Sequence, residues 1–200
     1  MTSTETNRVK GRLTLVVLAL VFILPMAVAY LWQPSGDAGN YGTLIEPPRP
    51  LAQFEMTDLD GNAAGIDTLR EKWTLLYVGG EQCLAQCRSS LYKIERVRLT
   101  QGKNIKRVQS LYLAPGTTDA RAMEDTLVEY AGVRGYRITR DQLNAMAPGF
   151  EWGTSGQEGA SDRIYLVDPL GNLMMSYPGD ADPTGMKKDL QRLLKVSQIG

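Results

Sequence analysis

Cys83 and Cys87 are the only cysteines in the chain, and three residues separate them. An apolar run at residues 73–78 precedes them and ends at Gly79 and Gly80, which is typical of a buried strand followed by a turn. Beyond the glycines, apolar side chains recur at three- and four-residue steps, the pattern of an amphipathic helix, at Leu84, Cys87, Leu91, Ile94 and Val97. Both cysteines are therefore predicted to lie at a strand-to-helix junction, one helical turn apart on one face.

Two sulfur atoms placed in this way can close a disulfide or bind one soft metal ion. Cys83 falls at the start of the predicted helix, where unpaired amide groups and the helix dipole favour a thiolate. A pair of thiolates suits Cu(I), a soft ion that accepts a low coordination number. A thioether could supply a third ligand, and the sequence does not choose among the candidates Met123, Met146, Met174 and Met175.

The composition restricts the remaining chemistry. The sequence contains no histidine, so an imidazole-based acid–base site, haem ligand or zinc site cannot be built. Lysine plus arginine equals aspartate plus glutamate, at 22 each, so there is no basic field to bind nucleic acid, and we expect no nucleic-acid partner. Any chemistry must use sulfur, carboxylates, amines or hydroxyls.

The N-terminal part predicts a membrane anchor. Residues 1–12 are polar with a basic end and are expected in the cytoplasm, and residues 13–32 are apolar and close in length to the ~20 residues that a spanning helix needs. Residues 33–50 are rich in proline and glycine and predict a tether, so the folded domain is expected over residues 51–200.

These segments predict a location in the inner (plasma) membrane, with a single pass and the domain in the periplasm. A cleaved signal peptide is the alternative, because residues 27–29 resemble a small-residue cleavage site. Under either interpretation both cysteines reach an oxidising compartment, where a close pair can exist as a disulfide.

The rest of the pattern predicts a mixed α/β domain. A hairpin is expected where Asp60-Gly61-Asn62 separates two short strands at residues 54–58 and 63–66. Further strands are expected at 108–113, 163–167 and 173–177, helices at 119–130, 139–147 and from 183 onward, and a long loop at 148–160. This order gives a mixed sheet with helices on both faces, a three-layer α/β sandwich.

With a cysteine pair after its first core strand, this order resembles the thioredoxin-like fold, and within that fold the sequence is similar to the Sco/SenC family. The resemblance covers most of the chain from Leu51 onward. Its residues are Gly79 four positions before Cys83, the Cys-x-x-x-Cys spacing, Leu91 four positions after Cys87, Phe54, Asp58, Gly61, residues 69–73 and the run Tyr165-Leu166-Val167-Asp168-Pro169-Leu170-Gly171. The layout of an anchor followed by a tether matches as well.

The resemblance implies a membrane-anchored copper protein used in cytochrome c oxidase assembly. It implies Cys83 and Cys87 as copper ligands, and an oxidase subunit or another assembly factor as partner. The sequence departs from the family at two points. Leu84 and Arg88 stand where members usually carry proline after each cysteine, and the histidine that completes their copper site is missing from its expected place near Ala160. The resemblance therefore implies the fold and pathway more strongly than a three-ligand site.

Three functions for Cys83 and Cys87 stay open at this point. The pair could handle Cu(I), exchange disulfides with the cysteines of an oxidase subunit, or form a structural disulfide in a binding module. The structural role explains little, because a bridge that closes so short a loop constrains the unfolded chain weakly. No turnover of a small molecule is expected, so the chain is not predicted to be a classical enzyme; it would be a thiol–disulfide oxidoreductase if it is one.

A general thioredoxin-like reductase is disfavoured by two features. The spacing of the cysteines is one residue longer than Cys-x-x-C, and Asp162 stands where a substrate-side proline is expected, three residues before Tyr165. A narrow range of partners is therefore expected if the pair exchanges disulfides.

Overall fold

The computed structural model describes residues 3–31, 39–146, 163–197 and 199. Its internal contacts divide the chain into two compact units, Met1–Gly39 and Asn40–Gly200, each of which is described by itself. The prediction for the loop at 148–160, and the positions Ala160 and Asp162, lie outside the described residues.

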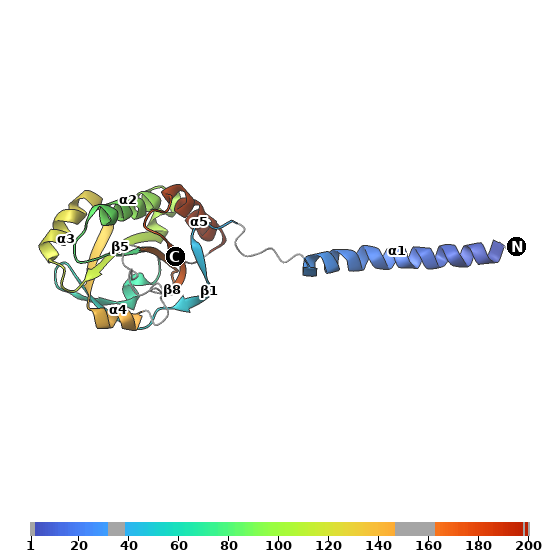
Figure 1. Cartoon of the computed structure of the whole chain (residues 1–200), viewed down its shortest axis with the longest axis horizontal. Coiled ribbons are helices and arrows are strands. Elements are labelled where there is room, and N and C mark those ends of the chain that lie inside the picture. The colour runs from blue at the N-terminus through green and yellow to red at the C-terminus, as the bar shows by residue number, and fades with distance from the viewer. Residues whose placement is uncertain (1–2, 32–38, 147–162, 198, 200) are drawn as a thin grey trace. The chain divides into compact units, whose positions relative to one another are not determined.

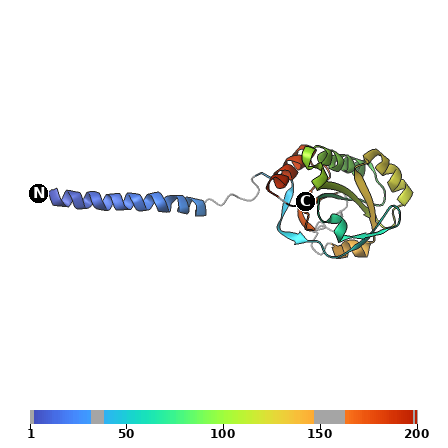
Figure 2. The same ribbon diagram turned by 180° about the vertical axis from the view of Figure 1, so that it is seen from behind.

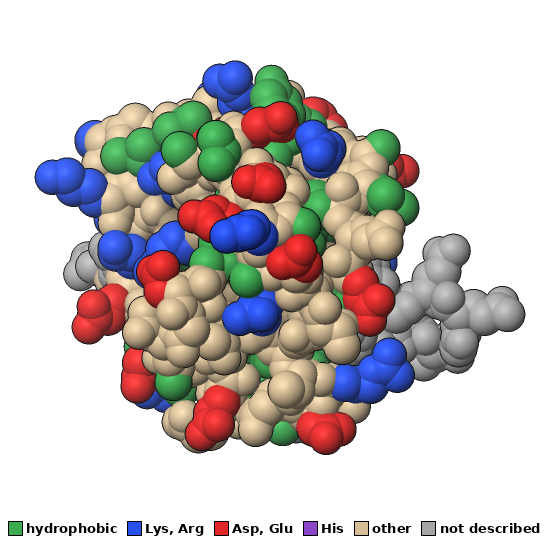
Figure 3. Space-filling view, turned by 90° about the vertical axis from the view of Figure 1, so that its left-hand side faces the viewer, with side chains coloured by type: hydrophobic (Ala, Val, Ile, Leu, Met, Phe, Trp, Pro, Cys, Tyr) green, Lys and Arg blue, Asp and Glu red, His purple; other side chains and the backbone are tan. Residues whose placement is uncertain are grey.

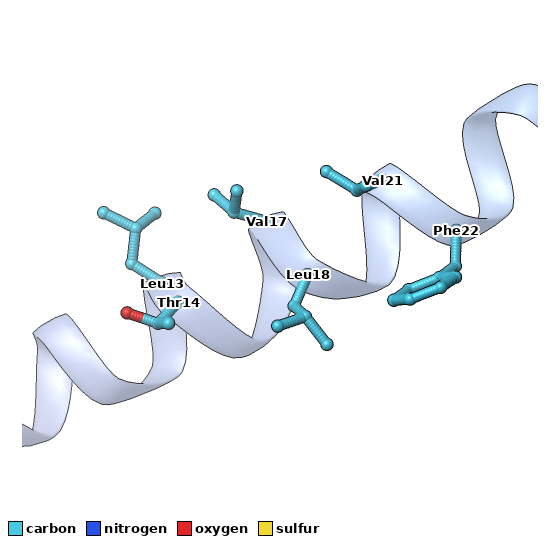
Figure 4. A pocket seen from close by; sticks show the side chains of 6 residues that line it. All are labelled: Leu13, Thr14, Val17, Leu18, Val21 and Phe22. Carbon is cyan, nitrogen blue, oxygen red and sulfur yellow. The ribbon is translucent and has the colours of Figure 1, made fainter.

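The first unit contains the helix α1 (Ser3–Leu31). Apolar side chains are exposed along it. Figure 4 shows the side chains that line one shallow pocket, five of them apolar: Leu13, Thr14, Val17, Leu18, Val21 and Phe22. Within the part of the chain that the structure describes, no helix has the length and apolarity required of a membrane span.

The second unit is built on one sheet of eight strands in the order β1-β8-β7-β4-β5-β6-β2-β3. β4, β5 and β6 run parallel, and β7 and β8 continue the sheet in antiparallel pairs from β4. The strands are β1 (Thr43–Pro50), β2 (Glu55–Asp58), β3 (Ala63–Gly65), β4 (Trp73–Val78), β5 (Val108–Pro115), β6 (Val133–Ile138), β7 (Arg163–Val167) and β8 (Asn172–Tyr177).

Helices cover both faces of this sheet. α2 (Ala85–Leu99), α3 (Ala120–Leu127) and α5 (Pro183–Val196) lie on one face, and α4 (Arg140–Met146) lies on the other (Figures 1 and 2). Short 3-10 helices complete the unit at η1 (Ile66–Leu69), η2 (Gly102–Arg107) and η3 (Val128–Tyr130). The predicted three-layer α/β sandwich is therefore confirmed.

The central strand β4 contributes side chains to two hydrophobic cores, one on each face of the sheet. All six of its residues are buried. Leu75 and Tyr77 pack into the core under α2, α3 and α5, whereas Leu76 and Val78 pack into the core that includes Met146 of α4. Because successive side chains of a strand point to opposite faces, a continuous apolar run is what a strand covered on both faces requires.

The structure corrects the prediction of a tether through Pro50. Residues 43–50 form β1, an edge strand that pairs antiparallel with β8, and the compact unit begins at Asn40 instead of Leu51. The pairing has partners at Thr43, Leu44, Arg49 and Pro50 and a register shift between Leu44 and Arg49. An edge strand tolerates proline because only one of its sides needs ladder hydrogen bonds, so a proline-rich sequence can hide a strand.

Strand β6 was not predicted. Its sequence Val-Arg-Gly-Tyr-Arg-Ile carries a glycine in the middle, which weakens any strand signal. Gly135 lets α3 pack closely there, because a Cβ atom would lie 2.5 Å from Leu127 Cδ1 and 2.8 Å from Met123 Cε, and the ends of these two α3 side chains would have to shift. Close packing of α3 onto the sheet thus explains why β6 contains a glycine, the residue that weakens its strand signal.

Most other predicted elements are confirmed. The Asp60-Gly61-Asn62 hairpin joins β2 and β3, the strands at 73–78, 108–113, 163–167 and 173–177 form, and the helix after Cys83 ends at Leu99, shortly before Gly102. The helix expected over residues 119–130 is α3 followed by η3, and the helix expected over 139–147 is α4.

Candidate functional site

Cys83 and Cys87 are joined by a disulfide, with their Cα atoms 5.1 Å apart. Leu84 precedes α2 with an extended backbone, and Cys87 lies in the first turn of the helix. The predicted strand-to-helix junction is therefore confirmed. The prediction that both cysteines lie on one helical face is corrected, because Cys83 precedes the helix and the extended Leu84 backbone brings its sulfur to Cys87.

The two half-cystines differ in exposure. Cys87 is 3% exposed and belongs to the core beneath α2, together with Leu91 and Ile94. Cys83 is only partly buried and lines a surface pocket. Cys83 is therefore the more accessible of the two residues to an incoming thiol or disulfide.

Two stacked tyrosines support the loop that carries Cys83. The rings of Tyr77 and Tyr112 are 5.5 Å apart, and a Cβ atom at Gly79 would lie 2.7 Å from Tyr112 Cε2. The Gly79 amide donates to the Leu113 carbonyl oxygen at 3.0 Å, which continues the β4–β5 ladder for one more residue. Glycine is therefore required at 79 for close approach to these rings.

The pocket beside Cys83 lies between the cysteine loop and α3 and has a volume of about 640 Å³. Glu81 and Gln82 line it on the side of the cysteine loop, and Met123 and Asp125 line it on the side of α3. The Thr117 hydroxyl donates to Glu81 Oε1 at 2.8 Å, which ties the two sides together. Sequence reasoning missed this pocket because its walls come from segments that are far apart in the chain.

Carboxylates outnumber cations around the pocket. Glu81, Asp119 and Asp125 line it, whereas its one lining cation, Arg88, forms an ion pair of 3.5 Å with Glu129. Figure 3 shows the α3 side of the domain, on which acidic and basic side chains are interspersed, so the excess of carboxylates is local to the pocket. The surroundings of Cys83 are therefore net negative even though the whole chain is neutral.

The structure separates the four methionines considered as a third copper ligand. Met123 lines the same pocket as Cys83, although its side chain is 2% exposed. Met146 lies in the core on the opposite face of the sheet. Met175 is buried on β8, where its sulfur accepts a hydrogen bond of 3.6 Å from the Tyr177 hydroxyl, and Met174 lies on the same strand. Met123 is thus the one of the four that lines the same pocket as Cys83.

The donor set at the pair fits copper only in part. Two sulfurs are present, and reduction of the disulfide would give a thiolate pair suited to Cu(I). Imidazole, which Cu(II) prefers, does not occur in the sequence. Within the described ranges, no group of three or more histidine, cysteine, aspartate or glutamate side chains is arranged to hold a metal ion. Among the described residues, the two cysteines are therefore not part of such a group.

Comparisons with known proteins agree with the fold. The family model described as transmembrane-like, thioredoxin-like, C-terminal domain matches residues 73–197. No curated protein sequence matches the chain.

Solved structures of Sco proteins are similar in fold. Copper-bound ScoI from Bradyrhizobium japonicum has 21% identity and a TM-score of 0.57, and the match covers 72% of this chain and 98% of that one. Copper-bound yeast Sco1 has 19% identity and a TM-score of 0.61, with coverage of 75% and 91%. BsSco, described as a Sco-family cytochrome c oxidase assembly protein with a disulfide switch, has 13% identity and a TM-score of 0.58, with coverage of 78% and 99%. The domain therefore has a thioredoxin-like fold of the Sco type.

Proposed function

Because the chain belongs to the family of transmembrane-like, thioredoxin-like proteins, we propose that it passes electrons to a partner protein by thiol–disulfide exchange at Cys83 and Cys87. The observation that carries this proposal is the unequal exposure of two bonded sulfurs. Cys83 lines an open pocket and Cys87 is 3% exposed, which is the arrangement of an attacking thiol with a protected resolving thiol.

The exchange runs in two balanced steps. In the reduced protein, the Cys83 thiolate attacks one sulfur of a partner disulfide, so that a mixed disulfide forms and one partner thiolate leaves. The Cys87 thiolate then attacks the Cys83 sulfur, which releases the second partner thiolate and closes the disulfide between the two residues. Two electrons pass to the partner, and an upstream protein dithiol returns the pair to its reduced state.

We propose cytochrome c oxidase assembly as the setting, with an oxidase subunit or another assembly factor as the partner. The support is the resemblance of the sequence to the Sco/SenC family and the fold shared with BsSco, whose own description names oxidase assembly and a disulfide switch. In this proposal the chain reduces cysteines of the subunit that must be free to bind copper.

Trapping of the mixed disulfide tests the exchange. The reduced full-length protein is mixed with a peptide that contains one intramolecular disulfide, and the products are followed by intact mass after acid quenching. Cys87→Ser should accumulate the mixed disulfide at Cys83, because the resolving thiol is missing. Cys83→Ser is the matched control and should accumulate none. If the reduced wild-type protein leaves the peptide disulfide intact, the exchange function is wrong.

Cu(I) handling by the reduced pair is the second candidate. The position of Met123 in the wall of the Cys83 pocket favours it, because a thioether could join two thiolates around a soft ion. Titration of the reduced full-length protein with Cu(I) against a chromophoric chelator should then give one equivalent, abolished by Cys83→Ser and weakened by Met123→Leu. Met175→Leu, at a buried site on β8, is the control. Failure to compete with the chelator would contradict the copper role.

We also propose that residues 13–32 anchor the chain in the inner (plasma) membrane, with the domain in the periplasm. Support for the anchor comes from the sequence alone, from the apolar stretch and the basic residues before it. Alkaline carbonate extraction of membranes should leave the full-length chain in the pellet, and a protease added to spheroplasts should digest the domain. Release into the carbonate supernatant would contradict the anchor.

A further inference from the structure

The pocket beside Cys83 has properties that the exchange chemistry alone does not need. Its volume of about 640 Å³ is in the range of sites for ligands of many atoms and far exceeds what one ion requires. It extends from the partly buried Cys83 across to Thr126 on α3. An occupant of this pocket would therefore lie beside Cys83, the residue proposed to attack.

The carboxylates of the pocket favour an occupant with positive charge. Glu81, Asp119 and Asp125 face it, and the guanidinium of Arg88 is paired with Glu129 at 3.5 Å. Asp119 also caps α3 by accepting the Arg121 amide at 3.0 Å, so this carboxylate is held in place at the pocket. Carboxylates gathered around a hollow raise the local concentration of cationic partners and repel anionic ones.

A buried hydroxyl points to a polypeptide as the occupant. Thr118 lines the pocket and is 7% exposed, and its Oγ1 has no hydrogen-bond partner among the residues that the structure describes. A buried polar atom left without a partner costs free energy, so a ligand group that reached this hydroxyl would gain a hydrogen bond that the fold does not supply. A hydroxyl can donate to a peptide carbonyl oxygen or accept from a peptide N–H.

We propose that this pocket binds a basic, extended segment of the partner protein, next to the partner cysteine that exchanges with Cys83. The inference rests on the proposed exchange function and adds the chemistry by which the partner is recognised. Lysine or arginine side chains of the segment pair with Glu81 and Asp125, and its backbone bonds to the Thr118 hydroxyl. The partner is thereby restricted to cysteines that lie in a basic sequence.

Binding is tested first with peptides that cannot exchange. Three fluorescent peptides carry serine in place of cysteine and are flanked by lysine, serine or glutamate, and their binding to the oxidised full-length protein is followed by anisotropy at low salt. The lysine peptide should bind about fivefold or more tightly than the serine peptide, and the glutamate peptide should bind more weakly still. The difference should shrink when the salt concentration is raised.

Charge reversal places the effect at the pocket. Asp125→Lys should lower the affinity for the lysine peptide about fivefold or more, and Glu81→Lys should act in the same direction. Glu71→Lys makes the same change of charge beside the opposite end of β4, at an exposed site, and should leave the affinity unchanged within about twofold. Equal binding of the three peptides, or equal effects of Asp125→Lys and Glu71→Lys, would overturn the inference.

The cysteine forms of the same peptides, each with one intramolecular disulfide, separate this inference from the proposed function. Faster reduction of the lysine peptide than of the glutamate peptide supports both. Equal reduction of all three means that the exchange function stands and the basic-segment inference is wrong. Selective binding of the serine-substituted lysine peptide without reduction of any cysteine peptide means that the pocket preference stands and the exchange function is wrong.

Discussion

Tyr41 donates its backbone N–H to Asp189 Oδ2 at 2.9 Å, although 148 residues separate the two in sequence. The same oxygen accepts the Gly42 amide at 3.0 Å and the Tyr177 hydroxyl at 3.3 Å. Asp189 is 2% exposed on α5, so its carboxylate is a buried anchor for the start of β1. The Lys188 ammonium lies over the Tyr41 ring at 5.1 Å from its centre and bonds to its hydroxyl at 3.0 Å, which holds this segment from outside.

Loss of the buried carboxylate should destabilise the domain. Asp189→Ala leaves two backbone amides and a tyrosine hydroxyl without their acceptor, and such changes lower the free energy of unfolding by about 2 to 3 kcal/mol. Urea unfolding of the full-length chain followed by near-ultraviolet circular dichroism measures the change. Asp125→Ala removes an exposed carboxylate from α3 and should change the free energy of unfolding by less than about 0.5 kcal/mol. Similar effects of the two substitutions would contradict the anchoring role.

Adjacent glycines before the cysteines should respond differently to alanine. A Cβ atom at Gly79 would lie 2.7 Å from Tyr112 Cε2 and 3.0 Å from Tyr77 Cε1, whereas one at Gly80 would meet nothing within 4 Å. Gly79→Ala should therefore lower the free energy of unfolding by about 1 to 3 kcal/mol, because two packed rings must move. Gly80→Ala should be neutral or slightly stabilising, because it restricts the unfolded chain. The urea midpoints of both variants decide the question, and equal midpoints would show that the rings yield freely.

The domain should lose stability at alkaline pH through Tyr165. Burial raises the pKa of this phenol to about 12 from its ordinary value of 10.0. Between these two pH values the phenol of the unfolded chain has lost its proton, whereas that of the folded chain keeps it. The free energy of unfolding is therefore unaffected by this group below pH 10 and falls as the pH rises toward 12. The loss from this group amounts to about 2 to 3 kcal/mol.

Urea unfolding at several pH values between 9 and 12 measures this dependence in the wild type and in Tyr165→Phe. The variant should show a shallower decline, because the residue that titrates has been removed. Tyr177 contributes in the same direction, since burial and then the Asp189 carboxylate raise the pKa of its hydroxyl. An unchanged slope in Tyr165→Phe would contradict the prediction.

The two thiols of the reduced protein should react with an alkylating reagent at different rates. Cys83 lines the pocket, whereas Cys87 is 3% exposed beneath α2, so iodoacetamide should label Cys83 about tenfold faster or more at neutral pH. Peptide mapping by mass spectrometry after short labelling times gives both rates. Unfolding in urea is the control, because it should make the two rates similar. Faster labelling of Cys87 in the folded protein would contradict the assignment of Cys83 as the attacking thiol.

The fold was predictable where the signal was local. The apolar run of β4, the amphipathic spacing of α2 and the Asp60-Gly61-Asn62 turn each lie within a few residues, and each formed as expected. Strands β1 and β6 were not predicted, because β1 contains prolines and β6 contains Gly135, and both residue types are uncommon within strands. Only the neighbouring elements explain why these residues are tolerated there. An edge strand tolerates the prolines of β1, and the glycine of β6 leaves room for the side chains of α3.

For this protein, sequence alone determined that two cysteines lie at a strand-to-helix junction and that no imidazole is present, because both facts depend only on residue types and local spacing. Tertiary structure decided which of the two cysteines is the more exposed, which methionine lines the same pocket and which charges surround it. These features arise where α2 and α3 pack on the same face of the sheet. That packing buries Cys87, places Met123 in the pocket wall and brings Glu81 and Asp125 to the same pocket. Such contacts join residues far apart in the chain, so no local pattern could contain them.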